Sequence, residues 1–205
     1  MNKEQIIAAS LEAFNEKGLT GASLRAIASR LGISDGHLRY YFKTREDLVL
    51  ATFEAMDADI LSRSKAPAAD GFSWRFMLDE LTGTFLVMYD YRCFFLESPV
   101  RLKELKKVHA AYQQLMGSRR ELFLQLFKGL QQLHIFDSRY SDGDFDSLFE
   151  QFFILSDSWV KQAYLHPAHN AIDQTAAHYA RLSLLLFLPF VKEPHKQQLL
   201  DLKDL

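Results

Sequence analysis

The sequence predicts an all-α fold in two parts, with short helices in the N-terminal part and longer helices in the C-terminal part. Apolar residues recur with the 3.6-residue period of a helix along most of the 205 residues, whereas alternating apolar and polar runs are almost absent. Two short apolar patterns lie on either side of Gly32, and a segment with the composition of a linker, KAPAADGFS, follows at residues 65–73.

The first helix is expected over residues 3–17, with Ile6, Leu11 (or Ile7), Ala13 and Phe14 on its inward face. Gly18 can adopt the left-handed conformation that commonly ends a helix, and Leu19 can supply the apolar contact that follows it. The N-terminal part therefore begins with one amphipathic helix.

Two short helices come next. Ser23 is a natural N-cap for the second helix, whose inward residues have the spacing i, i+3, i+4, i+7. These residues are Leu24, Ile27, Ala28 and Leu31. Gly32 allows a tight turn, and Ser34 caps a third helix expected over residues 35–41. Two helices joined by a glycine-containing turn form a helix-turn-helix motif.

A fourth helix is expected from Thr44 to about Lys65, with Thr44 as its cap and Asp47 three residues later. It leads into the linker and gives the predicted domains: residues 1–47, a connecting helix over residues 48–65, and residues 66–205. Six helices are expected in the last domain, followed by a short amphipathic turn. Their ranges are 72–90, 91–97, 99–106, 108–135, 144–165 and 170–188.

Positive charge is concentrated around the helix-turn-helix, although the whole chain has a net charge of −2. Residues 17–45 carry six cations against the single acid Asp35, a local excess of five positive charges. The cations are Lys17, Arg25, Arg30, Arg39, Lys43 and Arg45. A cationic patch on such a motif predicts binding to double-stranded DNA, with the third helix in the major groove.

If Leu38 points inward, the remaining residues of the third helix face outward. This outward set is Asp35, Gly36, His37, Arg39, Tyr40 and Tyr41. The hydroxyls of Ser23 and Ser34 lie at the two helix N-termini, where they can contact phosphates as well.

The order of these residues resembles the TetR family of bacterial transcriptional regulators over about residues 3–50. The segments that carry the resemblance are AFNEKG, SLRAIASRLGIS and GHLRYYFKTREDL. The resemblance implies an all-α homodimer with an N-terminal DNA-binding domain and a C-terminal domain for ligand binding and dimerisation. It also implies DNA contacts by Ser23 and Arg25, while Lys43 and Arg45 hold the DNA backbone. The groove or its walls would be faced by Ser34, Asp35, Gly36, His37, Tyr40 and Tyr41.

Arg39 departs from the family, which usually has a tyrosine that contacts phosphate after the leucine of this helix. An arginine can make the same phosphate contact with a full charge, or it can bind the edge of a guanine through two hydrogen bonds. Both roles remain open from the sequence.

The C-terminal 145 residues contain 14 Phe, two Trp and six Tyr, more aromatic surface than packing alone requires. We expect part of it to line a pocket for a hydrophobic or aromatic small molecule, although each residue taken singly can also belong to the core. The candidate lining residues are Phe76, Phe85, Met88, Tyr89, Cys93, Phe94, Tyr112, Met116, Phe123 and Phe127.

The last two long helices are apolar on more than one face, which is typical of helices buried on both sides. A four-helix interface, with two helices from each chain of a homodimer, explains this pattern better than the core of a monomer. The residues expected there are Phe149, Phe152, Phe153, Trp159, Leu182, Leu185 and Leu186.

No catalytic constellation, metal site or cofactor motif is predicted. His166 and His169 flank a proline without a carboxylate or thiol to complete a ligand set, and Cys93 is the single cysteine. A lone cysteine, the absence of an apolar run of membrane-spanning length and the absence of a secretion signal at the N-terminus predict a cytoplasmic protein without membrane contact.

The predicted function is a ligand-responsive repressor that binds a palindromic operator as a homodimer and is released by a hydrophobic or aromatic effector. An activator of the same fold is an alternative that the sequence does not distinguish. Two further alternatives are a regulator that acts through protein partners and a helical ligand-binding or enzyme module without an operator.

Overall fold

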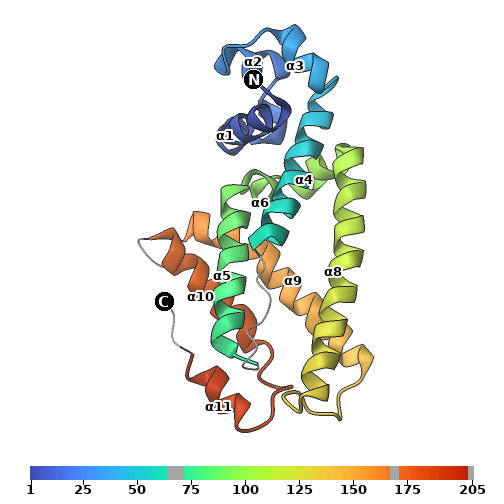
Figure 1. Ribbon diagram of the computed structural model, residues 1–205, viewed down its shortest axis with the longest axis vertical. Helices are drawn as coiled ribbons and strands as arrows, with labels where there is room; N and C mark the ends of the chain where they lie inside the picture. Colours follow the sequence, from blue (N-terminus) through green and yellow to red (C-terminus); the bar gives the residue numbers. More distant parts are fainter. Residues whose placement is uncertain (64–71, 167–170, 203–205) are drawn as a thin grey trace. The chain divides into compact units, whose positions relative to one another are not determined.

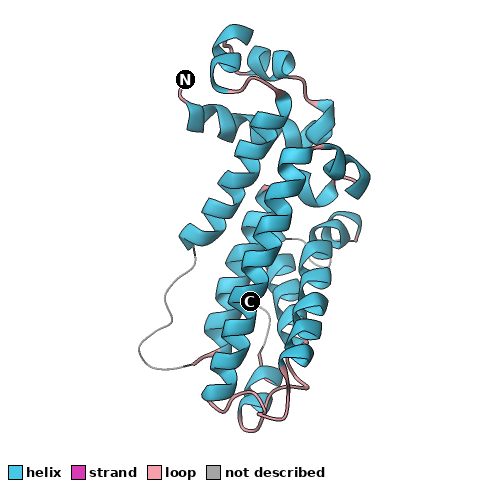
Figure 2. Ribbon diagram, turned by 90° about the vertical axis from the view of Figure 1, so that its right-hand side faces the viewer, coloured by secondary structure: helices cyan, strands magenta, loops and turns pink. Residues whose placement is uncertain are grey.

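A computed structural model of the chain describes residues 1–63, 72–166 and 171–202, and these are helices joined by loops (Figures 1 and 2). Lys65, most of the predicted linker 65–73, and His169 lie outside the described residues. The all-α prediction is confirmed, since the described part contains no strand beyond an isolated bridge between Phe136 and Val191. No helix of the described residues combines the length and apolar character needed to cross a membrane.

The helices follow the predicted order, with boundaries that differ from the expected ones by a few residues. They are α1 Lys3–Gly21, α2 Leu24–Arg30, α3 Asp35–Tyr41, α4 Arg45–Arg63, α5 Trp74–Asp90, α6 Cys93–Leu96, α7 Pro99–Glu104, α8 Lys106–Gln132, α9 Asp142–Leu165, α10 Ile172–Leu185 and α11 His195–Leu200. The predicted short turn in the tail is α11.

The chain divides into two compact units that do not follow a single cut in the sequence. The first unit contains residues 1–62 together with 87–114, and the second contains residues 63–86 together with 115–205. The segment 87–114 is thus grouped with the N-terminal helices. The sequence-based boundary at residue 66 stays a prediction.

The core of the first unit forms where α1 to α4 bring their apolar faces together. Ile6, Phe14, Leu38 and Leu48 are fully buried. Gly18 interrupts α1 with φ 74° and ψ 164°, so the expected end of the first helix is a kink rather than a stop. The residues after the kink bury Leu19.

The short helix α6 packs against α1 within the first unit. Asn15 on α1 joins the two, because its amide nitrogen donates to the carbonyl oxygen of Asp90 at 2.7 Å and its amide oxygen accepts from the backbone N–H of Cys93 at 3.0 Å. Asn15 therefore ties the loop between α5 and α6 to α1 through two hydrogen bonds.

The second unit has an aromatic core. The rings of Phe127, Phe136, Phe145 and Phe187 contact one another with centroids 5.4–6.1 Å apart. α9 packs on α10, and α10 packs on α11. Because all four rings are 0–1% exposed, packing within a single chain accounts for a large part of the aromatic content.

Candidate DNA interface

The two helices of the motif have the caps expected from the sequence. The backbone N–H of Ala26 donates to Ser23 Oγ, and the backbone N–H of His37 donates to Ser34 Oγ, both at 3.1 Å. Each bond satisfies one of the free N–H groups of a helix start. Between the helices, Gly32 takes a φ of 64°, which a side chain would disfavour.

α3 is attached to the unit by few side chains. Leu38 is its only buried residue, and Phe42, directly after the helix, is also buried. Gly36, His37, Arg39 and Tyr40 are exposed, whereas Asp35 and Tyr41 are half-buried. The outward set therefore lies where the sequence predicts it.

The ring of Tyr40 is the most exposed large apolar group of the described residues, with 81% of its surface accessible. It meets the ring of Tyr41 edge to face, and Tyr41 meets His37 in the same way, with centroids 5.0 and 5.6 Å apart. His37 Nε2 also lies 3.0 Å from the carbonyl oxygen of Met1. These contacts give the outer face of α3 a defined aromatic surface.

Arg39 is held by neighbours on both sides. Its Nε donates to Asp35 Oδ2 at 2.6 Å, one helical turn earlier, and its Nη1 donates to the carbonyl oxygen of Lys43 at 3.4 Å. The side chains of Arg39 and Asp35 are 51% and 42% exposed, so the pair lies at the surface.

Besides Arg39, two of the six predicted cations bind other groups of the protein. Arg30 bonds Glu16 at 2.6 Å and Glu12 at 3.2 Å, and the bond from its guanidinium holds the pKa of the Glu16 carboxyl below its ordinary value. Arg45 donates to the carbonyl oxygen of Thr20 at 2.7 Å. The local charge excess available to a partner is therefore smaller than the sequence count.

Arg25 and Lys43 differ from these two cations. Both are exposed and have no ion-pair partner among the described residues. They are the cations of the motif best able to bind an external anion.

Contacts from residues 101–107 brace this region, and sequence reasoning did not identify them. Lys107 Nζ pairs with Asp47 Oδ1 at 2.5 Å, its backbone N–H donates to Glu46 at 2.7 Å, and Arg101 donates to Thr20 Oγ1 at 2.7 Å. The partners are 60 or more residues apart. No local pattern indicates contacts of that separation.

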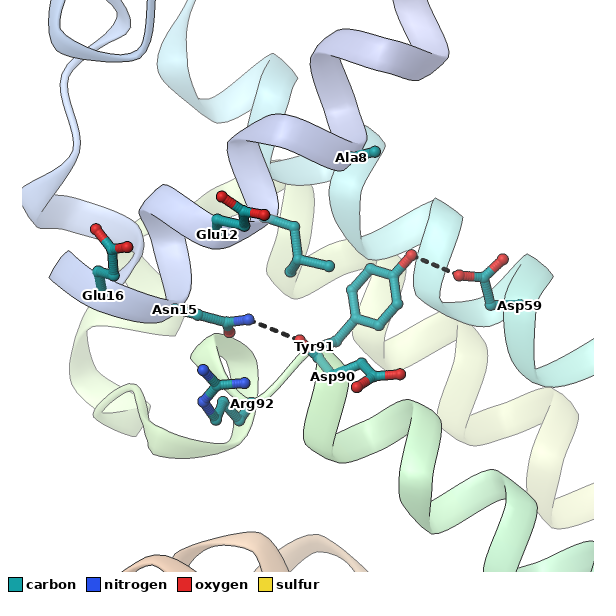
Figure 3. A pocket seen from close by; sticks show the side chains of 9 residues that line it. Ala8, Glu12, Asn15, Glu16, Asp59, Asp90, Tyr91 and Arg92 are labelled. Carbon is teal, nitrogen blue, oxygen red and sulfur yellow. Dashed lines mark hydrogen bonds between the residues drawn. The ribbon is translucent and has the colours of Figure 1, made fainter. Parts of the chain in front are cut away.

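An open hollow of about 450 Å³ lies in the first unit between α1, α4 and the loop after α5 (Figure 3). Its lining includes the carboxylates of Glu12, Glu16, Asp59 and Asp90, together with Arg92. The Tyr91 hydroxyl donates to Asp59 Oδ2 at 2.6 Å across this surface (Figure 3). None of the predicted effector-pocket residues lines this hollow, and its carboxylates make it unsuited to an apolar ligand.

The ten predicted effector-pocket residues divide between the units. Met88, Tyr89, Cys93, Phe94 and Tyr112 belong to the first unit, and Phe76, Phe85, Met116, Phe123 and Phe127 belong to the second. Burial raises the pKa of the Cys93 thiol to about 12, so this thiol stays protonated near neutral pH.

Several of these residues have close partners in the packed core. Phe94 meets Phe53 at 5.4 Å between centroids, and Phe127 contacts Phe136 and Phe145. Tyr112 is 37% exposed. The pocket assignment stays a prediction.

The residues predicted for the dimer interface also fall into two groups. Phe149, Phe152 and Trp159 are 5%, 4% and 0% exposed in the single chain, so other parts of the same subunit already cover them. Phe153, Leu182, Leu185 and Leu186 are half-buried. Ile154, Tyr164 and Leu165 on α9 lie outside the predicted interface set and are 69%, 63% and 56% exposed.

Comparisons with known proteins match both parts of the chain. A family model described as bacterial regulatory proteins of the tetR family matches residues 6–52, and one described as bacterial transcriptional repressor matches residues 55–199. The tetracycline repressor protein class D of Escherichia coli is 36% identical over 81 residues, which are 38% of this chain and 35% of that protein. The matches span about a third of the length of the curated relatives.

Solved structures extend the similarity of fold over the whole chain. The crystal structure of a TetR-family transcriptional regulator from Marinobacter aquaeolei VT8 has a TM-score of 0.79 at 20% identity, with 98% of this chain and 96% of that chain covered. A TetR variant from Acinetobacter baumannii AYE, crystallised with minocycline, has a TM-score of 0.53 at 18% identity, with coverages of 92% and 96%. Because one family model alone matches more than half of the sequence, this chain belongs to the TetR family of bacterial transcriptional regulators.

Proposed function

We propose that this chain is a repressor that binds a palindromic operator as a homodimer and leaves it when a hydrophobic or aromatic small molecule binds. The exposed outer face of α3 is the observation that carries the proposal. A helix whose only buried side chain is Leu38 contributes little to the core, so its other residues are available for a partner. In a helix-turn-helix protein that partner is the major groove of DNA.

The charges of the motif support a DNA partner. Arg25 lies on α2 and Lys43 lies in the short loop between α3 and α4, and both are exposed. The N-caps Ser23 and Ser34 keep their hydroxyls at the starts of α2 and α3. We infer that Ser23, Arg25 and Lys43 hold phosphates, while His37, Tyr40 and Tyr41 face the groove.

The exposed apolar residues of α9 support a homodimer. Ile154 and Leu165 are three helical turns apart and therefore lie on one face of the helix, which a monomer would leave in water. Fully burying one such side chain contributes about 1.5–3 kcal/mol. We infer that this face of α9 contacts the partner chain together with Leu182, Leu185 and Leu186 of the α10 region.

Family relatives support a small-molecule effector. The solved structures that share this fold include a TetR variant crystallised with minocycline, and from this we infer an aromatic small molecule as the class of effector. An effector can shift the protein away from DNA only by the difference between its affinities for the two conformations.

Fluorescence anisotropy of the purified protein on a duplex from immediately upstream of its own coding region tests DNA binding. We expect a logarithm of the association constant that falls linearly with the logarithm of salt concentration, with a slope of about −0.9 per phosphate contact. A scrambled duplex of the same composition is the control. Equal, weak and salt-insensitive binding to both duplexes, repeated with a random duplex library, would refute the proposal.

Sedimentation equilibrium tests the homodimer separately. The wild-type chain should sediment as a dimer, and Ile154→Glu should increase the fraction of monomer while leaving the helical content unchanged. The matched control is Leu126→Glu on α8, whose side chain is 38% exposed and outside the proposed interface. If both variants remain fully dimeric, α9 is not the interface.

A further inference from the structure

The ion pair between Asp35 and Arg39 on α3 has a geometry that sets the direction of an arginine side chain. Nε of Arg39 donates to Asp35 Oδ2 at 2.6 Å, which leaves the two terminal nitrogens as the free end of the guanidinium. Nη1 makes only a long bond of 3.4 Å to the Lys43 carbonyl oxygen. That bond is weak enough to exchange for a better acceptor.

Asp35 itself is poorly placed to contact a base. Its Oδ2 accepts from Arg39, and its Oδ1 is covered by the protein and has no hydrogen-bond partner among the described residues. Oδ1 is thus closed to a base edge, and Oδ2 is already engaged by Arg39. The carboxylate also repels phosphate, so its contribution to DNA binding must come through the arginine.

The pairing also distinguishes the two roles open to Arg39. A phosphate contact depends mainly on net positive charge, which a carboxylate one turn away partly cancels. A contact with the edge of guanine depends on direction, because the two donors of the fork must meet O6 and N7 together. The bond from Nε to Asp35 fixes the direction of the guanidinium and leaves its two terminal nitrogens as the free end, but it also lowers the net positive charge at this position. This arrangement favours the guanine contact over the phosphate contact.

The neighbour on the same face leaves room for such an approach. Gly36 lies three residues before Arg39, so the two share one face of α3. A side chain is missing there, and a Cβ added at Gly36 would meet no atom closer than 3.9 Å. Packing within the protein therefore does not explain this glycine, whereas close approach of base pairs does.

We propose that Arg39 binds a guanine in the major groove through its two terminal nitrogens, and that Asp35 is the positioning residue that aims it. The proposal rests on the proposed function, since it names the base-specific contact of the same DNA interface. Each half-site of the operator then contains a G·C pair at the position that faces Arg39.

Selection from a duplex library with 30 random base pairs tests this assignment without knowledge of the operator. Wild type should enrich half-sites with one fixed guanine. Arg39→Lys keeps the charge but lacks the fork, and it should lose discrimination at that position by roughly tenfold or more. Asp35→Asn should lose discrimination at the same position while its overall affinity stays equal or rises, because a negative charge is removed.

A matched control is available on α5. Arg75 and Asp79 form a surface pair of the same i,i+4 spacing, with Nε to Oδ1 at 3.0 Å and side chains 47% and 50% exposed. Asp79→Asn removes a carboxylate of the same kind, and it should select the wild-type sequences. Circular dichroism of each variant monitors folding.

Replacing the selected guanine by 7-deazaguanine sharpens the test, since it removes the N7 acceptor and keeps base pairing. Wild-type affinity should fall, and an Arg39→Met variant, whose side chain has no hydrogen-bond donor, should not respond. The outcome that overturns the proposal is an unchanged selected sequence in Arg39→Lys with no response of wild type to the modified base. Unchanged discrimination in Asp35→Asn would remove the positioning role. If wild type enriches no sequence and shows no salt-dependent binding, the proposed function itself fails.

Discussion

The indole of Trp159 stacks on the ring of Phe85, with centroids 5.1 Å apart and planes 7° from parallel. Both side chains are almost completely buried, at 0% and 1% exposure. The pair joins α9 to α5 inside the second unit. A residue that the apolar pattern assigned to the dimer interface is therefore part of the subunit core.

Trp159→Ala should lower the free energy of unfolding by about 3–5 kcal/mol, because it removes this stacking and leaves a cavity. Urea unfolding monitored by circular dichroism measures the loss. Trp159→Phe is the control, and it should lower the free energy of unfolding by less, since it keeps an aromatic ring on Phe85. If Trp159→Ala is as stable as wild type and only its dimerisation is weakened, Trp159 belongs to the dimer interface and not to the subunit core.

Removing single cations should separate those that contact DNA from those used inside the protein. Lys43→Ala should reduce the steepness of the salt dependence by about 0.9, the value for one phosphate contact. Arg30→Ala should leave that slope unchanged, because its guanidinium is bound to Glu16 and Glu12. The measurement is anisotropy of the selected duplex at four or more salt concentrations. Equal changes of slope in the two variants would contradict this division.

Acid should weaken the contact between Asp47 and Lys107. Hydrogen bonds from Lys107 and from Thr44 hold the pKa of the Asp47 carboxyl below its ordinary value. Because the folded-state pKa is the lower one, the stabilisation is present above the unfolded pKa and is lost as pH falls through the folded pKa. The urea midpoint should thus fall less between pH 6 and pH 3 in Asp47→Asn than in wild type. Parallel pH profiles for the two proteins would exclude a contribution from this carboxyl.

Gly18 and Gly117 should respond in opposite directions to alanine. Gly18 has φ 74° and ψ 164°, a conformation essentially restricted to glycine, so Gly18→Ala should cost about 1–3 kcal/mol. Gly117 lies within α8, where an added Cβ meets nothing within 4 Å, so Gly117→Ala should stabilise the protein by about 0.5–1 kcal/mol. Thermal unfolding of the two variants shows whether each melting temperature falls or rises. An unchanged melting temperature in Gly18→Ala would refute the strain argument.

Local signals made the helices and the DNA-binding motif predictable. Ser23, Ser34 and Thr44 cap helices in the structure as expected, because a cap depends on residues three positions apart. The inward position of Leu38 follows in the same way from helical periodicity. Membership in the family could also be predicted from the segments around the motif, before any comparison.

Burial of the aromatic residues was less predictable. A helix that is apolar on several faces can be covered by its own subunit or by a second copy, and periodicity does not distinguish the two. Trp159 and Phe152 are covered by their own chain, whereas Ile154 between them in sequence is 69% exposed. Only the arrangement of neighbouring helices decides which face of α9 is free.

By itself the sequence determined that this protein is helical, where its capped helices begin, and that α3 carries an exposed cationic and aromatic face. The apolar period of a helix and its cap depend on residues that are close together in the sequence, so short segments are enough to predict them. The tertiary structure alone decided that Arg30 is neutralised by α1, that Asn15 holds the loop before α6, and that Lys107 pairs with Asp47. Such pairings depend on side-chain direction and on contacts between distant segments, which form only when the chain has folded.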